Sequence, residues 1–264
     1  MDYLFAQFDK IEELLRDKFL LLLLDYDGTL TPIAETPGQA VISKETKRLL
    51  LRISGLTDSI LGIISGRSLK DLKGLVGIKG IIYAGNHGLE IQGPKIRFKS
   101  PVSPGSRSII RDIAADLRKG LSGIKGILIE DKGLTLSIHY RLAERKDLAA
   151  IERIVTKITG AYRARDKIEM SSGKKVYEIK PPVKWDKGKV VLWLMARRQF
   201  AAGDKFVLPV YIGDDVTDED AFRALKRRGL TIFVGRPGNS DADFYLKDVK
   251  EVIKFLRLVL KLKR

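Results

Sequence analysis

The sequence predicts an α/β protein: a mostly parallel sheet flanked by helices, with a smaller α+β domain inserted into it. Helices and strands alternate over about the first hundred residues, a Pro/Ser/Gly-rich segment at 101–105 breaks this alternation, and it returns after residues 181–182. The chain has 264 residues, enough for one large domain or two modest ones. We therefore expect residues 1–103 and 181–264 to form a core domain and residues 104–180 to form the insert.

The apolar segment at 19–24 is the clearest strand of the first part. It consists of Phe19 followed by five leucines, which is too short to cross a membrane and suits a strand buried on both faces of a parallel sheet. Apolar spacing and the capping residue Ser43 predict the helices around it. The predicted helices cover residues 3–16, 44–55 and 69–76, and the predicted strands cover residues 19–24, 59–64 and 80–84.

The middle part has a different pattern. Leu134, Leu136 and Ile138 alternate with polar residues, which is typical of an antiparallel sheet with one open face. A turn at 131–133 would join this strand to the preceding one. We expect helices at about 106–119 and 144–159, and strands at 126–129, 134–140, 161–169 and 174–180.

The last part returns to the α/β alternation. A helix is expected to begin at 185–189, with Val190, Val191 and Leu194 facing inward. We expect strands at 207–212 and 230–234, and helices at about 219–228 and 248–262.

Composition limits the classes of function. Lys and Arg total 49 against 33 Asp and Glu, so the net charge is +16 and anionic ligands are favoured. The basic residues are scattered and not interleaved with aromatic ones, so we expect no nucleic-acid partner, although a basic nucleic-acid-binding protein stays an alternative. With no cysteine, disulfide and thiolate chemistry are excluded. We expect no signal peptide and no membrane segment, and therefore a cytoplasmic protein; the oligomeric state is not predicted.

Two pairs of aspartates follow buried strands. Asp25 and Asp27 come directly after the strand at 19–24, and Asp214 and Asp218 follow the strand at 207–212. Because parallel strands present their carboxyl ends to a common crevice, these carboxylates are expected to meet. Oxygen ligands of this kind suit Mg²⁺. Asp25 could act as a nucleophile that forms an aspartyl-phosphate, and Asp27 as a general acid and base; the alternative is a plain Asp-Gly turn.

Other polar residues near these strand ends suit a phosphate group. Ser65 and Gly66 follow the strand at 59–64, where a hydroxyl and backbone amides could bind an anion, and Thr29 offers the same groups. Their alternative role is simple capping. Arg67 could bind phosphate bidentately or pair with an acid. Lys187 could offset the carboxylates and the phosphoryl group, with Lys184 and Lys189 as rivals.

These residues together resemble the haloacid dehalogenase superfamily of phosphatases. The shared pattern is Asp-x-Asp-Gly-Thr at 25–29, Ser65, Lys187, and Gly-Asp-Asp-x-x-Asp at 213–218. The resemblance implies a Rossmann-like core, with the insert as a C2-type cap. Finer matches at 85–90, 130–133, 139–141, 178–181 and 185–188 resemble the trehalose-6-phosphate phosphatase family, over residues 19–236.

The resemblance implies a role for each matching residue. Asp25 would be the nucleophile, Asp27 the acid and base, and Asp25, the carbonyl of Asp27 and Asp214 would hold Mg²⁺ with support from Asp218. Ser65, Gly66 and Lys187 would bind phosphate. The residues expected to meet sugar hydroxyls are Glu130, Lys132 and Glu178 in the cap, with His87 and Glu90 nearby in the core. His139, by its strand pattern, is expected to be a surface histidine.

The activity implied is Mg²⁺-dependent hydrolysis of trehalose 6-phosphate, a small sugar phosphate, to trehalose and phosphate. The family often has Arg where Lys180 stands, so a related phosphatase is an alternative. Its substrate would be sucrose 6-phosphate, mannosyl-3-phosphoglycerate or glucosylglycerol phosphate. A phosphotransferase or phosphomutase on the same core is a further alternative.

Overall fold

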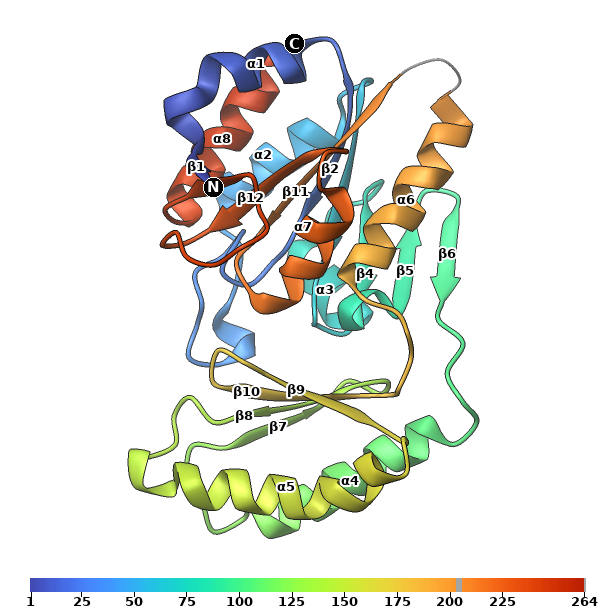
Figure 1. Ribbon diagram of the computed structural model, residues 1–264, viewed down its shortest axis with the longest axis vertical. Helices are drawn as coiled ribbons and strands as arrows, with labels where there is room; N and C mark the ends of the chain where they lie inside the picture. Colours follow the sequence, from blue (N-terminus) through green and yellow to red (C-terminus); the bar gives the residue numbers. More distant parts are fainter. Residues whose placement is uncertain (203–205, 264) are drawn as a thin grey trace. The chain divides into compact units, whose positions relative to one another are not determined.

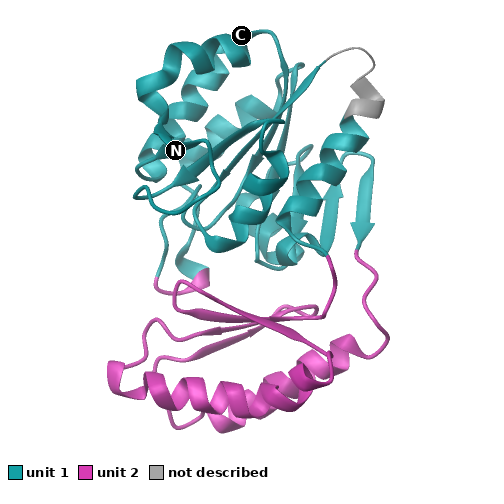
Figure 2. Ribbon diagram, viewed as in Figure 1, with its two compact units in different colours: residues 1–34, 38–99, 185–264 teal, residues 35–37, 100–184 magenta. Residues whose placement is uncertain are grey.

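The chain folds into two compact units. The computed structural model describes residues 1–202 and 206–263, and their side chains apart from those of 199–202. One unit contains residues 1–34, 38–99 and 185–264, and the other contains residues 35–37 and 100–184 (Figure 2). The second unit is thus an insertion in the sequence of the first. The domain boundaries at 103/104 and 180/181 stay a prediction.

The first unit is built on one large sheet. Its strands are β1 (Asp2–Tyr3), β2 (Phe19–Leu24), β3 (Ser59–Ile64), β4 (Ile82–Gly85), β5 (Glu90–Gly93), β6 (Ile96–Lys99), β11 (Val207–Gly213), β12 (Leu230–Val234) and β13 (Phe244–Leu246). Within the described residues the order is β1-β13-β12-β11-β2-β3-β4-β5-β6 (Figure 1). All pairs from β1 to β4 are parallel, and β5 and β6 add an antiparallel edge. The predicted α/β class is confirmed.

Helices cover both faces of this sheet. They are α1 (Phe8–Arg16), α2 (Lys44–Ser54), α3 (Leu69–Val76), α6 (Lys187–Ala202), α7 (Glu219–Leu225) and α8 (Val249–Leu262). Side chains alternate along β2, so Leu20, Leu22 and Leu24 pack in the core beneath α1, α2, α3 and α8. Leu21 and Leu23 pack beneath α6 and α7 on the opposite face. Full burial contributes about 1.5–3 kcal/mol for each such side chain, and this explains the uninterrupted leucines.

Most predicted elements of the first unit are confirmed. The bounds of β2, β3, β12 and α3 agree with the prediction, and Ser43 caps α2 by accepting a hydrogen bond from the N–H of Thr46 at 3.0 Å. The predicted helix at 3–16 is only partly right, because residues 2–3 form β1 and Leu4–Gln7 form a 3-10 turn before α1. Strands β5, β6 and β13 were not predicted.

The second unit is a four-stranded antiparallel sheet with two helices on one face. Its strands β7 (Leu128–Asp131), β8 (Leu136–His139), β9 (Glu169–Gly173) and β10 (Val176–Lys180) take the order β7-β8-β10-β9 among the described residues. Helices α4 (Ser106–Gly120) and α5 (Leu148–Ala164) cover the sheet (Figure 1). The buried members of its core include Ile113, Leu136 and Val155.

One predicted strand of this unit is wrong. Residues 161–164 belong to the last turn of α5, where Tyr162 packs against the unit's core. The helix ends before Asp166, whose φ of 50° is left-handed and reverses the chain. The strand therefore begins only at Glu169.

The remaining short turns are 3-10 helices. They are Pro37–Gln39, Asn86–Gly88, Arg145–Asp147 and Val216–Asp218. Of the helices described, none combines the length and the apolar character that crossing a membrane requires.

Candidate active site

Asp25 lies at the carboxyl end of β2, in the middle of the sheet. Its N–H donates to the carbonyl of Ile212 on the neighbouring β11 at 2.8 Å, and the residue is 5% exposed. Because β2 and β11 run in parallel, Asp25 and Asp214 emerge side by side. One carboxylate oxygen each of Asp25, Asp214 and Asp218 lie within 4.8 Å of one another. Three of the four predicted aspartates therefore meet, whereas the side chain of Asp27 pairs with Arg67.

Lys187 joins these carboxylates. It is the first residue of α6, and its Nζ donates to Oδ1 of Asp25 and to Oδ1 of Asp218, both at 2.7 Å. Burial alone would lower the pKa of this ammonium group, but Asp218 and Asp25 outweigh burial and raise its pKa well above the usual value. Burial also raises the pKa of the Asp25 carboxyl well above its usual value, an effect that Lys187 opposes. A helix N-terminus and a lysine thus place positive charge against the aspartates.

The two rival lysines lie elsewhere. Lys184 is exposed, and Lys189 is exposed and forms an ion pair with Asp186 at 2.8 Å. Lys187 is therefore the lysine that hydrogen bonds to the aspartate cluster.

Asp218 is held by four donors. Besides Lys187, its Oδ1 accepts from the hydroxyl of Tyr211 at 2.6 Å, and its Oδ2 accepts from the N–H groups of Asp214 and Asp215, each at 3.0 Å. Such a carboxylate orders the loop after β11 and the lysine beside it. Burial and Asp218 raise the pKa of Tyr211 well above its usual value, so the phenol stays a donor. Tyr211 was missed from the sequence; the signal was a tyrosine in a fully buried strand, which needs a partner for its hydroxyl.

The turn after β2 brings its backbone against Asp214. Gly28 has a φ of 85°, and an added Cβ would lie 2.1 Å from Oδ2 of Asp214, so only glycine fits. The next residue, Thr29, is fully buried, and within the described residues its hydroxyl has no hydrogen-bond partner. A buried hydroxyl next to this loop is free to bind a ligand oxygen.

The turn after β3 contains Ser65, Gly66 and Arg67. Ser65 is 1% exposed, and its hydroxyl accepts from the N–H of Arg67 at 3.2 Å. An added Cβ at Gly66 would lie 2.7 Å from Cε1 and Nε2 of His87, so the imidazole packs directly against this glycine. His87 belongs to the 3-10 turn after β4 and has a φ of 55°. The structure thus places His87 beside the predicted phosphate-binding residues.

Glu90, at the start of β5, lies near the same turn. Its Oε2 accepts from Nδ2 of Asn86 at 3.0 Å, and its Oε1 pairs with Nζ of Lys99 at 3.3 Å. Both of these partners lie outside the aspartate cluster.

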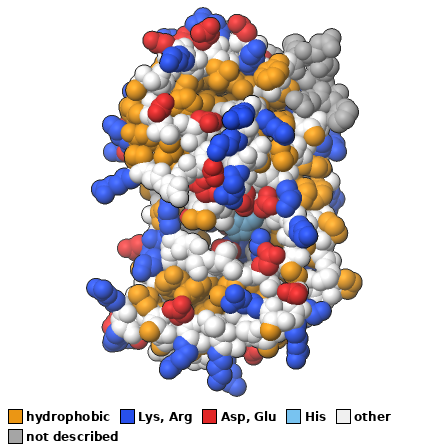
Figure 3. Space-filling view, viewed as in Figure 1, with side chains coloured by type: hydrophobic (Ala, Val, Ile, Leu, Met, Phe, Trp, Pro, Cys, Tyr) orange, Lys and Arg blue, Asp and Glu red, His pale blue; other side chains and the backbone are white. Residues whose placement is uncertain are grey.

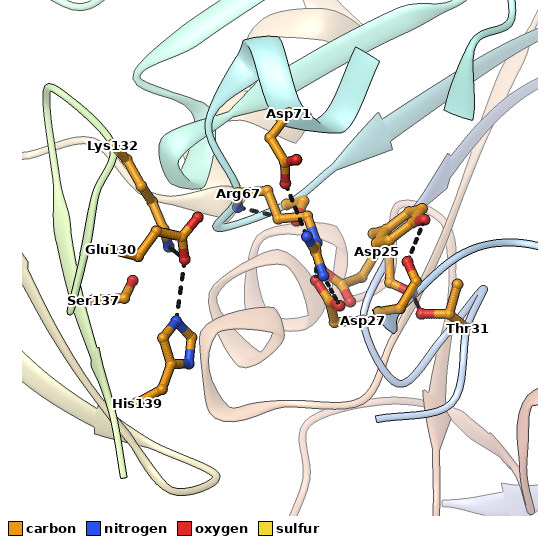
Figure 4. Close-up of polar contacts among 12 residues, drawn as sticks. Asp25, Asp27, Thr31, Arg67, Asp71, Glu130, Lys132, Ser137 and His139 are labelled. Carbon is orange, nitrogen blue, oxygen red and sulfur yellow. Dashed lines mark hydrogen bonds and ion pairs between the residues drawn. The ribbon is translucent and has the colours of Figure 1, made fainter. Parts of the chain in front are cut away.

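Arg67 forms a fork with Asp27. Its Nε and Nη2 donate to Oδ2 and Oδ1 of Asp27, both at 2.7 Å, and its Nη1 donates to Oδ2 of Asp71 at 2.8 Å (Figure 4). Burial alone would lower the pKa of the guanidinium, but Asp27 and Asp71 raise it above the usual value. Of the two alternatives given by the sequence, the hydrogen bonds of Arg67 match pairing with acids; phosphate binding by Arg67 stays a prediction.

A separate polar cluster lies in the second unit, on the face of its sheet opposite the core that contains Leu136 and Ile138. Glu130, Ser137 and Glu178 are neighbours in register across β7, β8 and β10. The Ser137 hydroxyl donates to Oε1 of Glu178 at 2.7 Å, and Nζ of Lys132 lies 3.4 Å from that oxygen. Ser137 was missed from the sequence, although its place two residues before His139 puts both on one face.

His139 belongs to this cluster as well. Its Nε2 lies 3.1 Å from Oε2 of Glu130 (Figure 4). Burial alone would raise the pKa of Glu130, but the hydrogen bond from His139 and the charge of Lys132 outweigh it and lower the pKa. The three residues predicted to bind a sugar thus form one network with His139 and Ser137, in which donors and acceptors alternate.

The chemistry of the first cluster fits a hard divalent cation. The donors are carboxylate oxygens, which suit Mg²⁺, while nitrogen and sulfur ligands are not part of the described cluster. Three buried carboxylates against one lysine also leave negative charge that a cation would offset. On the face shown in Figure 3, the visible Lys and Arg side chains are spread out and not gathered in one patch.

The chain is similar to known proteins over most of its length. A protein-family model described as trehalose-phosphatase matches residues 23–249. "Probable trehalose-phosphate phosphatase D" of Arabidopsis thaliana is 33% identical over 98% of this chain and 72% of its own length. "Trehalose-phosphate phosphatase B" of the same plant is 34% identical over 97% and 70%.

Solved structures are similar in fold. The C-terminal domain of Candida albicans trehalose-6-phosphate phosphatase has a TM-score of 0.80 at 24% identity, with 95% of this chain and 97% of that chain covered. A "trehalose-6-phosphate phosphatase related protein" has a TM-score of 0.76 at 25% identity, with 92% and 97% covered.

The matched residues include Asp25, Asp214, Asp218 and Lys187, which the structure brings together beside the carboxyl ends of β2 and β11. Relatives about a third identical span nearly the whole chain and most of their own length. The chain is a hydrolase of the trehalose-phosphatase family.

Proposed function

We propose that this protein hydrolyses trehalose 6-phosphate to trehalose and phosphate through a covalent aspartyl-phosphate. The observation that carries the proposal is the buried cluster in which Lys187 bridges Asp25 and Asp218 beside Asp214, in a chain of this family. Phosphoryl transfer needs a nucleophile, positive charge against the phosphoryl oxygens and a proton donor for the leaving alcohol. Asp25 would be the nucleophile, Lys187 at the start of α6 would provide the positive charge, and Asp27 would be the proton donor.

The first half-reaction forms the covalent intermediate. A carboxylate oxygen of Asp25 attacks phosphorus, the bond between phosphorus and the sugar oxygen breaks, and Asp27 gives its proton to that oxygen. In the second half-reaction Asp27 takes a proton from water, the water oxygen attacks the same phosphorus, and the bond to Asp25 breaks. Phosphate leaves and both carboxyl groups return to their starting state.

The other residues of the cluster bind and orient. Asp25, Asp214 and the main-chain carbonyl of Asp27 would hold Mg²⁺, with Asp218 ordering the loop behind them. When bound, the cation offsets negative charge on the phosphoryl oxygens. Lys187 stabilises Asp25 and charge that develops on the phosphoryl group.

Three groups near the strand ends would hold the phosphate itself. They are the buried Thr29 hydroxyl, the Ser65 hydroxyl and the N–H of Gly66. Phosphate binding by Arg67 was also predicted from the sequence, but its guanidinium pairs with Asp27 and Asp71 and it is not included among these groups. The prediction that Glu130, Lys132 and Glu178 bind sugar hydroxyls is supported by their network, because vicinal hydroxyls both donate and accept. His87 and Glu90 are proposed to assist from the core. A cytoplasmic location and the absence of a nucleic-acid partner stay predictions from the sequence.

The test is a substrate panel with phosphate release as the measurement. Trehalose 6-phosphate, sucrose 6-phosphate, mannosyl-3-phosphoglycerate and glucosylglycerol phosphate are compared with Mg²⁺ and with EDTA. We expect kcat/KM for trehalose 6-phosphate to exceed that of the others by at least about tenfold, and EDTA to abolish turnover. A higher kcat/KM for another sugar phosphate would correct the substrate, and phosphoryl transfer to a second sugar in place of water would indicate a transferase.

The nucleophile is tested with Asp25→Asn. Its turnover should fall by about a thousandfold or more, and mass spectrometry after acid quench should find the phosphoryl adduct on wild-type Asp25 but not on the variant. Asp186→Asn is the matched control, because that carboxylate is part-exposed and pairs with Lys189. Full turnover by Asp25→Asn would exclude the covalent route.

A further inference from the structure

All three guanidinium nitrogens of Arg67 donate to carboxylates of the protein. Arg67 is 5% exposed, two of its nitrogens meet both oxygens of Asp27, and a third meets Asp71. A parallel pair of N–H donors on one carboxylate is the strongest and most directional arrangement available to arginine. The guanidinium also lies over the ring of Tyr26, 5.2 Å from its centroid.

The partners of Arg67 are themselves fixed. Asp71 lies in the first turn of α3, where its N–H donates to the capping hydroxyl of Ser68 at 3.1 Å. Tyr26 is fully buried, and its hydroxyl donates to the carbonyl of Ala40 at 2.8 Å. Arg67 is therefore held by α3 and by the core beneath β2, whereas the side chain of Asp27 is 40% exposed. Without the fork, this carboxylate could rotate among its solvent-exposed rotamers.

We propose that Arg67 is a positioning residue for Asp27: its fork holds the acid/base carboxylate at the orientation from which a proton reaches the sugar oxygen. The proposal rests on the proposed function of Asp27. A carboxyl group that carries a proton on one oxygen still accepts at the other, so Arg67 can keep one contact while the proton moves. In this role Arg67 acts through Asp27 and does not contact the phosphate.

The leaving group distinguishes this role from phosphate binding. A sugar alkoxide needs a proton in order to leave, whereas p-nitrophenolate leaves without one. The parameter kcat/KM reports the first half-reaction, in which the leaving group departs, and the shared hydrolysis of the intermediate does not affect it. We therefore compare kcat/KM for trehalose 6-phosphate and p-nitrophenyl phosphate in wild type and Arg67→Gln.

The expected result is a selective loss. Arg67→Gln should lower kcat/KM for the sugar phosphate by about 10- to 100-fold, and for p-nitrophenyl phosphate by less than about threefold. Asp71→Asn removes the carboxylate that pairs with Nη1 of Arg67. It should also lower kcat/KM more for the sugar phosphate than for p-nitrophenyl phosphate, with a smaller loss than Arg67→Gln. Lys70→Gln is the control, since Lys70 is an exposed residue of α3, and it should leave both values unchanged. An equal loss for both substrates would mean that Arg67 binds phosphate, and the proposal would be overturned.

A double-mutant cycle gives a second, independent test. If Arg67 acts only through Asp27, then adding Arg67→Gln to Asp27→Asn should cost less than about twofold more in sugar-phosphate turnover. The full single-variant loss in the Asp27→Asn background would overturn the proposal.

The experiment distinguishes failure of the Arg67 proposal from failure of the proposed phosphatase activity. If Arg67→Gln does not fold, Arg67→Lys can replace it, because lysine keeps the charge but lacks the paired donors. Arg67→Lys should also lose more kcat/KM for trehalose 6-phosphate than for p-nitrophenyl phosphate. If wild type hydrolyses neither substrate, the proposed function and this inference fall together. If wild type is active and the losses are equal, only the inference falls.

Discussion

Replacing Lys187 should destabilise the first unit strongly. In Lys187→Met the carboxylates of Asp25 and Asp218 stay buried, at 7% and 0% side-chain exposure, but lose the ammonium group that lies 2.7 Å from each. Removing one partner from a buried ion pair costs about 3–5 kcal/mol, because the remaining charge is left without compensation. Met fills a similar volume, so the loss measures charge and not packing. We therefore expect the free energy of unfolding to fall by about 3–5 kcal/mol.

The measurement is equilibrium unfolding in guanidinium chloride with EDTA present, followed by tryptophan fluorescence. Both tryptophans of the chain, Trp185 and Trp193, belong to the first unit, so the signal reports that unit alone. Lys189→Met is the matched control, because Lys189 is exposed and its loss should stay within about 0.5 kcal/mol.

The deficit should depend on pH and on the cation. Lys187 opposes the rise of the Asp25 pKa, so its removal should raise that pKa further. A carboxyl whose pKa is raised in the folded state stabilises that state less as pH rises, so the deficit of Lys187→Met should be larger at pH 8 than at pH 5. Mg²⁺ should reduce the deficit by supplying positive charge. A deficit below about 1 kcal/mol at pH 8, or one equal to that of Lys189→Met, would refute the reasoning.

Three further predictions concern other parts of the molecule. Gly28→Ala should lose at least about 1–2 kcal/mol, because its φ of 85° is left-handed and the Cβ would strike Asp214, while Gly38→Ala, in open space, should be near neutral in the same unfolding assay. Mg²⁺ at about 100 times its Kd should stabilise wild type by about 2.7 kcal/mol in thermal unfolding, and Asp214→Asn should abolish most of that gain; an equal gain in both would exclude Asp214 as a ligand. The lowered pKa of Glu130 contributes stability above its usual pKa that is lost as pH falls, so Glu130→Gln should melt below wild type at pH 7 and converge with it in acid; a constant difference would contradict this.

The sequence predicted the buried strands and the meeting of the polar segments well. Strands β2 and β3 are uninterrupted apolar runs, and a parallel sheet brings their carboxyl ends to one edge. The common edge of a parallel sheet can be predicted without knowing any side-chain contact. It is the reason that Asp25, Asp214 and Lys187 could be grouped before the structure was known.

The missed features depend on distant partners. Strands β1 and β13 have two and three residues, too short for a periodic pattern. β13 pairs with β12, and β1 pairs with β13. Likewise, nothing local to Tyr211 shows that its hydroxyl meets Asp218. The Arg67 pair spans 40 residues, so the sequence could offer phosphate or an acid as its partner without choosing between them.

The position of β2 between β3 and β11 has a consequence for folding of the nascent chain during synthesis. Its pairing partner on one side, β3, follows soon after it, but the partner on the other side begins only at Val207. At about 5–20 residues per second, a ribosome needs roughly ten to forty seconds to make the intervening chain. Throughout that interval a run of leucines presents an open edge to the crowded cell, so the first hundred or so residues are the part of this protein that should depend most on a chaperone.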